Sequence, residues 1–331
     1  MSPDLRQVTT NFPQAMKQSK KIQPQAPEAA KPISEFRTVI TSSLVSVADV
    51  SLSITVAIIT GSSVMFAQGL QGLADLITTT FLLLGVKRSR RAASPSHPFG
   101  YGRELFFWVL IASLFAFLVS GGFAIYRAVQ QLIEGTPIDS VNLALATLAF
   151  GVLTNGYSLS NSVRRLIHGV KGKSFWGHLR HSSLVETKMT LLVDLMGTLS
   201  AILGLAALSL YQITGNTLYD GVGALIIGGL TATGALFVVV DLHDLIVGRS
   251  PQPDVIERIR KTALNVGGVQ DVLDLRAVSI GSGRILVILE IHFKDDLSTD
   301  DIERITDVIK ERVKKAEPQV TRIQVEAETP E

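Results

Sequence analysis

The run TGSSVMFAQGLQGLADLITTTFLLLGVKRSRR, residues 60–91, decides the fold of this chain. It holds more than 20 mostly apolar residues, interrupted by one acidic residue, Asp75, and it ends in a basic cluster. The core of a bilayer needs about 20 predominantly apolar residues per helix. The run therefore predicts a transmembrane helix over 64–86, followed by a basic loop.

Five further segments share this length and apolar character. The six predicted transmembrane helices cover 38–60, 64–86, 104–132, 141–166, 186–211 and 217–246. Charged residues make up 18% of the chain, against about 25% in soluble globular domains. This deficit lies within 37–248, so we expect an all-α membrane domain there, preceded by a disordered tail over 1–36.

The charges of the connecting loops predict the orientation in the membrane. Basic residues crowd the second and fourth connections, with no acidic residue among them: Lys87, Arg88, Arg90, Arg91 and Arg103, then Arg164, Arg165, Lys171, Lys173 and Arg180. The first connection is uncharged, and the third and fifth carry acidic residues only. Because basic loops stay on the cytosolic side, both termini are predicted to be cytosolic. We expect the membrane to be a plasma or inner membrane.

Residues 249–331 have the composition of a soluble domain. An amphipathic helix over 255–266 precedes two strands, 269–280 and 284–293, which Gly281-Ser282-Gly283 joins. A second helix, with Ser298 as its N-cap, runs to residue 316, and a last strand covers 320–327. The order αββαβ predicts a small α+β domain.

Several classes of function are disfavoured by composition and motifs. The net charge is only +2, which does not suggest a nucleic-acid-binding surface. No nucleophile motif or nucleotide-binding loop is present, so we do not expect an enzyme or a prosthetic group. The chain has no cysteine, and any metal site must therefore use oxygen or imidazole ligands.

Three carboxylates lie deep in the predicted helices: Asp49, Asp75 and Asp194. A charged side chain at the centre of a bilayer costs about 2.5–3.5 kcal/mol on insertion scales, so such a residue is a functional candidate. The alternative is a buried ion pair that fixes helix packing. Lys188, near the cytosolic start of its helix, and Arg127, near the outer end of its helix, are the available partners.

Two of these carboxylates have a neutral polar residue four positions earlier. Gln71 precedes Asp75, and Thr190 precedes Asp194. Residues at i and i+4 share one helix face, so two such helices facing each other would offer four ligands to a divalent cation. The spacing alone is a weak signal. Two histidines are further candidates, His97 in the second connection and His292 in the second strand of the soluble domain.

At these residues the sequence resembles the cation diffusion facilitator family. The supporting runs are TGSSVMFAQGLQGLAD (60–75), HPFGYGREL (97–105), LYDGVGALIIGGL (218–230), DLIVGRSP (244–251) and GGVQDVLDLRAVSIGSG (267–283). The resemblance implies a homodimer with six helices per chain and a ferredoxin-like cytosolic domain that dimerises. It also implies proton-coupled export of Zn²⁺, Fe²⁺, Mn²⁺ or a similar ion.

The family's transport site, a His or Asp four residues before an Asp on two helices, falls on Gln71 and Asp75, then on Thr190 and Asp194. Both Asp residues match, whereas Gln71 and Thr190 depart from the pattern and leave an all-oxygen ligand set. Oxygen ligands suit Mn²⁺ or Mg²⁺ better than Zn²⁺. Asp49 could add a third carboxylate.

Two functions follow from this departure. The leading one is a proton-coupled antiporter that exports a divalent cation. Asp75 and Asp194 form its ion site, and its preference is shifted from zinc toward harder ions. The alternative is a regulatory family member that keeps the fold and the dimer but no longer transports.

Overall fold

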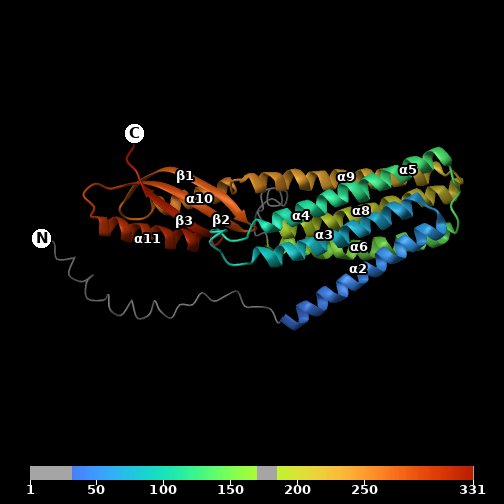
Figure 1. Cartoon of the computed structure of the whole chain (residues 1–331), viewed down its shortest axis with the longest axis horizontal. Coiled ribbons are helices and arrows are strands. Elements are labelled where there is room, and N and C mark those ends of the chain that lie inside the picture. Colours follow the sequence, from blue (N-terminus) through green and yellow to red (C-terminus); the bar gives the residue numbers. More distant parts are fainter. Residues whose placement is uncertain (1–31, 170–184, 331) are drawn as a thin grey trace. The chain divides into compact units, whose positions relative to one another are not determined.

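The structure is a computed structural model that describes the backbone of residues 32–169 and 185–330 (Figure 1). Side chains are described from residue 46 onward, except those of 165–169, 186 and 187. The chain divides into two units, Met1–Val45 and Ser46–Glu331, and every contact given below lies within the second unit. The helices of the membrane region are α2 (Pro32–Thr60), α3 (Ser63–Ser89), α4 (Glu104–Phe115), the π-helical turn η2 (Ala116–Gly121), α5 (Gly122–Glu134), α6 (Val141–Gly169), α8 (Val185–Thr214) and α9 (Leu218–Val247).

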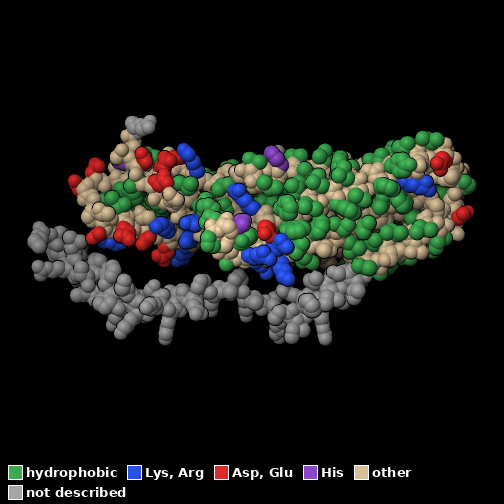
Figure 2. Space-filling model, in the orientation of Figure 1, with side chains coloured by type: hydrophobic (Ala, Val, Ile, Leu, Met, Phe, Trp, Pro, Cys, Tyr) green, Lys and Arg blue, Asp and Glu red, His purple; other side chains and the backbone are tan. Residues whose placement is uncertain are grey.

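Five helical segments of the described residues are long and apolar enough to cross a membrane. They are Ser63–Ser89, Glu104–Glu134, Val141–Arg164, Lys188–Thr214 and Leu218–Val247. Large hydrophobic side chains such as Leu118, Leu153 and Phe237 are exposed on these helices, as expected for surfaces that face lipid. On the face shown in Figure 2, hydrophobic side chains cover most of the helical region, and charged ones gather near its ends. The prediction of an all-α membrane region is confirmed.

For the first predicted span, 38–60, the structure describes side chains only from residue 46 onward. This span falls on α2, whose described side chains form a short apolar helix from Ser46 to Thr60. Helix α2 begins at Pro32, so it overlaps the last residues of the predicted tail. The remainder of that tail, 1–31, lies outside the described residues, as does most of the basic loop 164–180.

Two large apolar cores and one small one lie in the helix bundle. The first large core includes Val56, Val64, Leu148, Leu208 and Ile227, from α2, α3, α6, α8 and α9. The second includes Leu105, Phe106, Met189 and Leu242, from α4, α8 and α9, with Leu82 of α3 packed against it. Between the residues of the two large cores, α3, α8 and α9 carry the polar residues Asp75, Asp194 and Thr231. The small core, Ala74, Ala116 and Ala235, lies in the same interval.

A buried carboxylate holds the beginning of α3. Asp220, in the first turn of α9, is fully buried and accepts hydrogen bonds from the Ser62 hydroxyl at 2.6 Å and from the backbone N–H groups of Ser63 at 2.8 Å and Val64 at 3.0 Å. These N–H groups have no partner within a helix, and the helix dipole favours a negative charge at this end. Asp220 therefore joins α9 to the N-terminus of α3.

The soluble part has the predicted order αββαβ. It consists of α10 (Pro253–Leu264), β1 (Val269–Gly281), β2 (Arg284–Phe293), α11 (Thr299–Ala316) and β3 (Val320–Ala327). β2 is the central strand, antiparallel to β1 and parallel to β3. Its side chains alternate in burial, and the buried set packs with Ile259 of α10 and Val313 of α11. A small α+β domain is thus confirmed.

Two backbones approach closely between the second connection and the β1–β2 turn. A Cβ added at Gly102 would lie 2.4 Å from the carbonyl oxygen of Ile280, and one added at Gly281 would lie 2.9 Å from the Cα of Gly102. A side chain at either position would force the backbones apart. The glycines of two separate sequence runs, HPFGYGREL and GGVQDVLDLRAVSIGSG, therefore meet.

Candidate ion site

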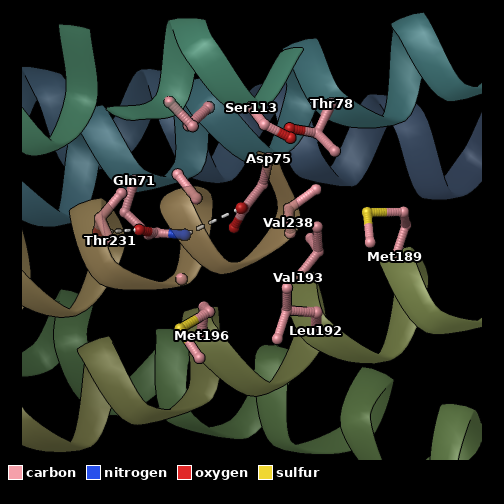
Figure 3. A pocket seen from close by; sticks show the side chains of 14 residues that line it. Gln71, Asp75, Thr78, Ser113, Met189, Leu192, Val193, Met196, Thr231 and Val238 are labelled. Atoms are coloured by element: carbon pink, nitrogen blue, oxygen red, sulfur yellow. Dashed lines mark hydrogen bonds between the residues drawn. The ribbon is translucent and has the colours of Figure 1, made fainter. Parts of the chain in front are cut away.

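Asp75 and Gln71 occupy one face of α3, at the interval between the two cores. The side-chain amide of Gln71 donates from Nε2 to Asp75 Oδ1 at 2.9 Å. The hydroxyl of Thr231, on α9, donates to Oε1 of the same amide. Figure 3 shows Gln71 between these two partners, with the carboxylate of Asp75 directed into a pocket. Gln71 therefore links α9 to Asp75.

The pocket beside Asp75 encloses about 50 Å³. One water molecule needs about 10–15 Å³ by this kind of measure, so the pocket can hold a few waters or a cation with part of its hydration shell. α3 contributes Gln71, Asp75 and Thr78, α4 contributes Ser113, and α8 contributes the thioethers of Met189 and Met196. The accessible wall is thus mostly apolar, with a few oxygen atoms from α3, α4 and α9 (Figure 3).

The predicted ligands of α8 face another way. The residues of α8 that line the pocket are apolar: Met189, Leu192, Val193 and Met196. Asp194 is half-buried and accepts a hydrogen bond from the hydroxyl of Ser162 on α6, and Thr190 is exposed. Asp194 and Thr190 therefore lie on the face of α8 that is turned away from this pocket.

Asp75 nevertheless lies close to the face of α8 that carries Asp194. Its second oxygen, Oδ2, lies 3.5 Å from the position that a Cβ of Gly197 would occupy, and Gly197 is less than one turn from Asp194. The carboxylates of Asp194 and Asp49 are near enough to act electrostatically on Asp75. Both of the other carboxylates that the sequence singled out in the membrane thus lie within electrostatic range of Asp75.

The bases considered as structural partners are engaged with other carboxylates. Lys188 Nζ lies 3.3 Å from Asp241 Oδ2 on α9, and Arg249 reaches the other oxygen of Asp241 at 2.7 Å. Arg127 acts electrostatically on Asp220, not on Asp75. The only hydrogen bond that Asp75 receives from the described residues is that of Gln71.

The two candidate histidines lie apart from these carboxylates. The ring of His97 stacks on Tyr101 at 4.3 Å between centroids, and its Nδ1 lies 3.1 Å from the Ser96 hydroxyl. His292, on β2, has Nδ1 at 3.3 Å from the carbonyl oxygen of Glu328. Within residues 46–164, 185 and 188–330, whose side chains the structure describes, no group of three or more His, Asp or Glu side chains could hold a metal ion.

Five polar residues at the site were not predicted: Thr78 on α3, Ser113 on α4, Thr231 on α9, and Asn155 and Ser162 on α6. Each lies in an apolar helix and is neutral, so it causes no interruption comparable to that of a carboxylate. The one available signal is that Asn155 and Ser162 stand seven residues apart, which is two turns and hence one face of a helix.

Comparison with known proteins gives the family. Residues 39–247 match the model of the cation efflux transmembrane domain, and residues 251–328 match that of the cation efflux protein cytoplasmic domain. The human mitochondrial proton-coupled zinc antiporter SLC30A9 is 30% identical over 238 residues, which are 71% of this chain and 42% of that protein. Metal tolerance protein C4 of Arabidopsis thaliana is 28% identical over 245 residues, 71% of this chain and 52% of that protein.

An archaeal relative is similar in length. An uncharacterised transporter of Methanocaldococcus jannaschii is 27% identical over 270 residues, 80% of this chain and 88% of its own. The chain spans about half or less of the human and plant relatives. The two domain matches, which together cover most of the chain, show that it is an integral membrane protein and not an enzyme, and that it belongs to the cation diffusion facilitator family.

Proposed function

We propose that this protein is a proton-coupled exporter of a divalent cation, in which Asp75 and Asp194 bind the cation and Gln71 and Thr190 support them. The observation that carries the proposal is the position of Asp75. Its carboxylate lies between two apolar cores, its hydrogen-bond donor in the described residues is a neutral amide, and two further carboxylates act on it. A divalent cation would offset the repulsion among these charges.

Proton coupling follows from the chemistry of the same groups. Carboxylates must be ionised to bind a cation, so protons compete with the cation for Asp75 and Asp194. A site that opens alternately to the two sides then exchanges cation for proton. The name of the human relative, a proton-coupled zinc antiporter, supports this exchange.

The supporting residues imply a small rearrangement on binding. Gln71 turns its nitrogen toward Asp75 and its oxygen toward Thr231. A half-turn of the amide about its last bond would present oxygen to the cation. Thr190 is exposed, one turn from Asp194, and we assign it the weaker contribution.

The ligands favour hard cations. Carboxylate and amide oxygens suit Mn²⁺ and Mg²⁺, and Fe²⁺ less strongly, whereas Zn²⁺ prefers nitrogen and sulfur. The name of the human relative specifies zinc. We therefore expect transport of Mn²⁺ to exceed transport of Zn²⁺ at equal free concentration, and a test of both ions separates the two expectations.

The organisation proposed from the sequence is retained: a tail over 1–36, a transport domain over 37–248 and a cytosolic domain over 249–331 that dimerises. Matches to the two family domains at 39–247 and 251–328 support these boundaries. The basic loops support cytosolic termini. Cysteines at Glu134 and Thr214, both exposed, should label from outside intact cells. Ser62 is unsuitable for this purpose because it is buried.

The deciding experiment is metal flux into proteoliposomes under a pH gradient. Wild type should move Mn²⁺, and Asp75→Asn and Asp194→Asn should each lower the affinity by more than a hundredfold, because about 3 kcal/mol or more is lost when one charge of the site is removed. Glu134→Gln, at the exposed end of α5, is the matched control and should transport normally. Normal transport by both Asp variants would place the site elsewhere, with Asp49 the next residue to test.

The second candidate is a family member that does not transport. The outward orientation of Thr190, together with Gln71 where the family has His or Asp, favours it. Wild type that moves no ion under any gradient, while remaining folded and dimeric, would establish this candidate.

A further inference from the structure

A third helix, α6, reaches the carboxylate of Asp75. The point of contact is Gly197 on α8, which has no side chain to fill the space between α6 and α3. A Cβ at Gly197 would lie 2.8 Å from Asn155 Oδ1 and 3.5 Å from Asp75 Oδ2. The two oxygens therefore lie near the same point and are no more than about 6 Å apart.

The hydrogen bonds of both side chains orient these oxygens. Asn155 Nδ2 donates to the carbonyl oxygen of Gly151 in its own helix at 2.9 Å, which leaves Oδ1 to face Gly197. Asp75 receives the Gln71 hydrogen bond on Oδ1. Among the described residues, no group donates a hydrogen bond to Asn155 Oδ1 or to Asp75 Oδ2. Two acceptors thus converge without a donor between them, which is the arrangement that a cation stabilises.

The same face of α6 also contacts the second acidic residue. Ser162, two turns from Asn155, donates its hydroxyl to the carboxylate of Asp194. One face of α6 therefore places a polar side chain near each of the two proposed acidic ligands.

We propose that Asn155 is a ligand of the transported cation through Oδ1, so that the ion site spans α3, α6 and α8. This inference rests on the proposed function, and it adds a neutral oxygen to a site whose other helices contribute Asp75 and Asp194. An amide oxygen is a ligand of hard cations such as Mn²⁺ and a poor one for Zn²⁺. Asn155 is thus a determinant of selectivity. The competing explanation is that Asn155 only fills the space opposite Gly197.

The test measures Mn²⁺ binding to the full chain in lipid nanodiscs by calorimetry, with flux into proteoliposomes as the second readout. Asn155→Leu keeps the size of the side chain and removes the oxygen. It should weaken Mn²⁺ binding at least tenfold and Zn²⁺ binding by less. Thr154→Val is the matched control, because the hydroxyl of Thr154 bonds only to the backbone of its own helix, at Phe150 and Gly151. It should bind both ions like wild type.

Asn155→Asp is a second, independent arm in case Asn155→Leu does not fold. A carboxylate at this position should tighten Mn²⁺ binding at neutral pH and make it fall more steeply as the pH is lowered, because a third ligand then competes for protons. Binding by Asn155→Leu or Asn155→Asp that equals wild type in affinity, ion preference and pH slope overturns the role of Asn155 alone. Wild type that binds none of Mn²⁺, Zn²⁺, Fe²⁺ and Mg²⁺ overturns the proposed function together with this inference.

Discussion

Replacing Asp220 by alanine should be among the most destabilising single changes in the membrane region. The carboxylate is fully buried and accepts three hydrogen bonds at the N-terminus of α3, from Ser62, Ser63 and Val64. The substitution removes all three at once. It leaves two backbone N–H groups and one hydroxyl buried without a partner, and it also removes the negative charge from the positive end of the helix dipole.

The expected loss follows from these contacts. A buried polar group left without its partner costs about 1–3 kcal/mol, and the interaction of a charge with a helix terminus contributes about 0.3–2 kcal/mol. Because the Ser62 hydroxyl can turn to another acceptor, we count two groups fully and expect a loss of about 2–8 kcal/mol for Asp220→Ala. Asp220→Asn keeps one oxygen acceptor, and we expect about half of that loss.

Steric trapping in lipid bicelles measures the free energy of unfolding of a membrane protein and suits this series. Glu134→Gln is the control on the same side of the bundle, since its side chain is exposed, and it should change the free energy of unfolding by less than about 0.5 kcal/mol. The reasoning is refuted by a value for Asp220→Ala within 1 kcal/mol of wild type. It is also refuted if Asp220→Asn is as damaging as Asp220→Ala.

Three further outcomes are expected. Gln71→His should shift the ratio of Zn²⁺ to Mn²⁺ flux at least tenfold toward Zn²⁺, because imidazole is a better ligand for zinc than an amide oxygen. An unchanged flux ratio would contradict this prediction. Hydrogen bonds from the Ser298 side chain and backbone, with the charge of Arg304, hold the pKa of Asp301 below its ordinary value of about 3.8. Its contribution to the stability of α11 is therefore complete above pH 4 and is lost as the pH falls through the lowered pKa. Asp301→Ala should accordingly reduce hydrogen-exchange protection in α11 at pH 6 but not near pH 2, and an equal reduction at both would count against this role. Light scattering in mild detergent should give the mass of a homodimer, and a monomer mass in both detergent and lipid would argue against one.

The elements could be predicted because their signals are local. The alternation of buried residues in β2 and the apolar length of α3, α8 and α9 can be read without knowing any long-range contact. Asp75 could be singled out for a similar reason, since a charge in an apolar run is costly wherever the helix packs.

The rotation of a helix about its axis could not be predicted in the same way. α8 is apolar nearly all round, so its sequence does not indicate which side meets α3. We expected the polar residues Thr190 and Asp194 to face the ion site because they are polar. In the structure, Met189 and Met196 face the pocket instead. Asn155 and Asp220 act through partners that are distant in the sequence, and nothing local to either residue identifies those partners.

The π-helical turn η2, between α4 and α5, bears on how this chain tolerates changes in length. A π-turn accommodates one residue more than an α-helix of the same rise. Ser120 in this turn donates to the carbonyl oxygen of Leu70, and Gly121 packs against Ala232. Loss of one residue between Ala116 and Gly121 would let the segment close into regular α-helix, without turning α4 and α5 relative to each other. Loss of one residue in α4 itself would turn everything before it by about 100°, the angle between successive residues of an α-helix. Length variation among relatives should therefore be tolerated at η2 and excluded from the helix on either side of it.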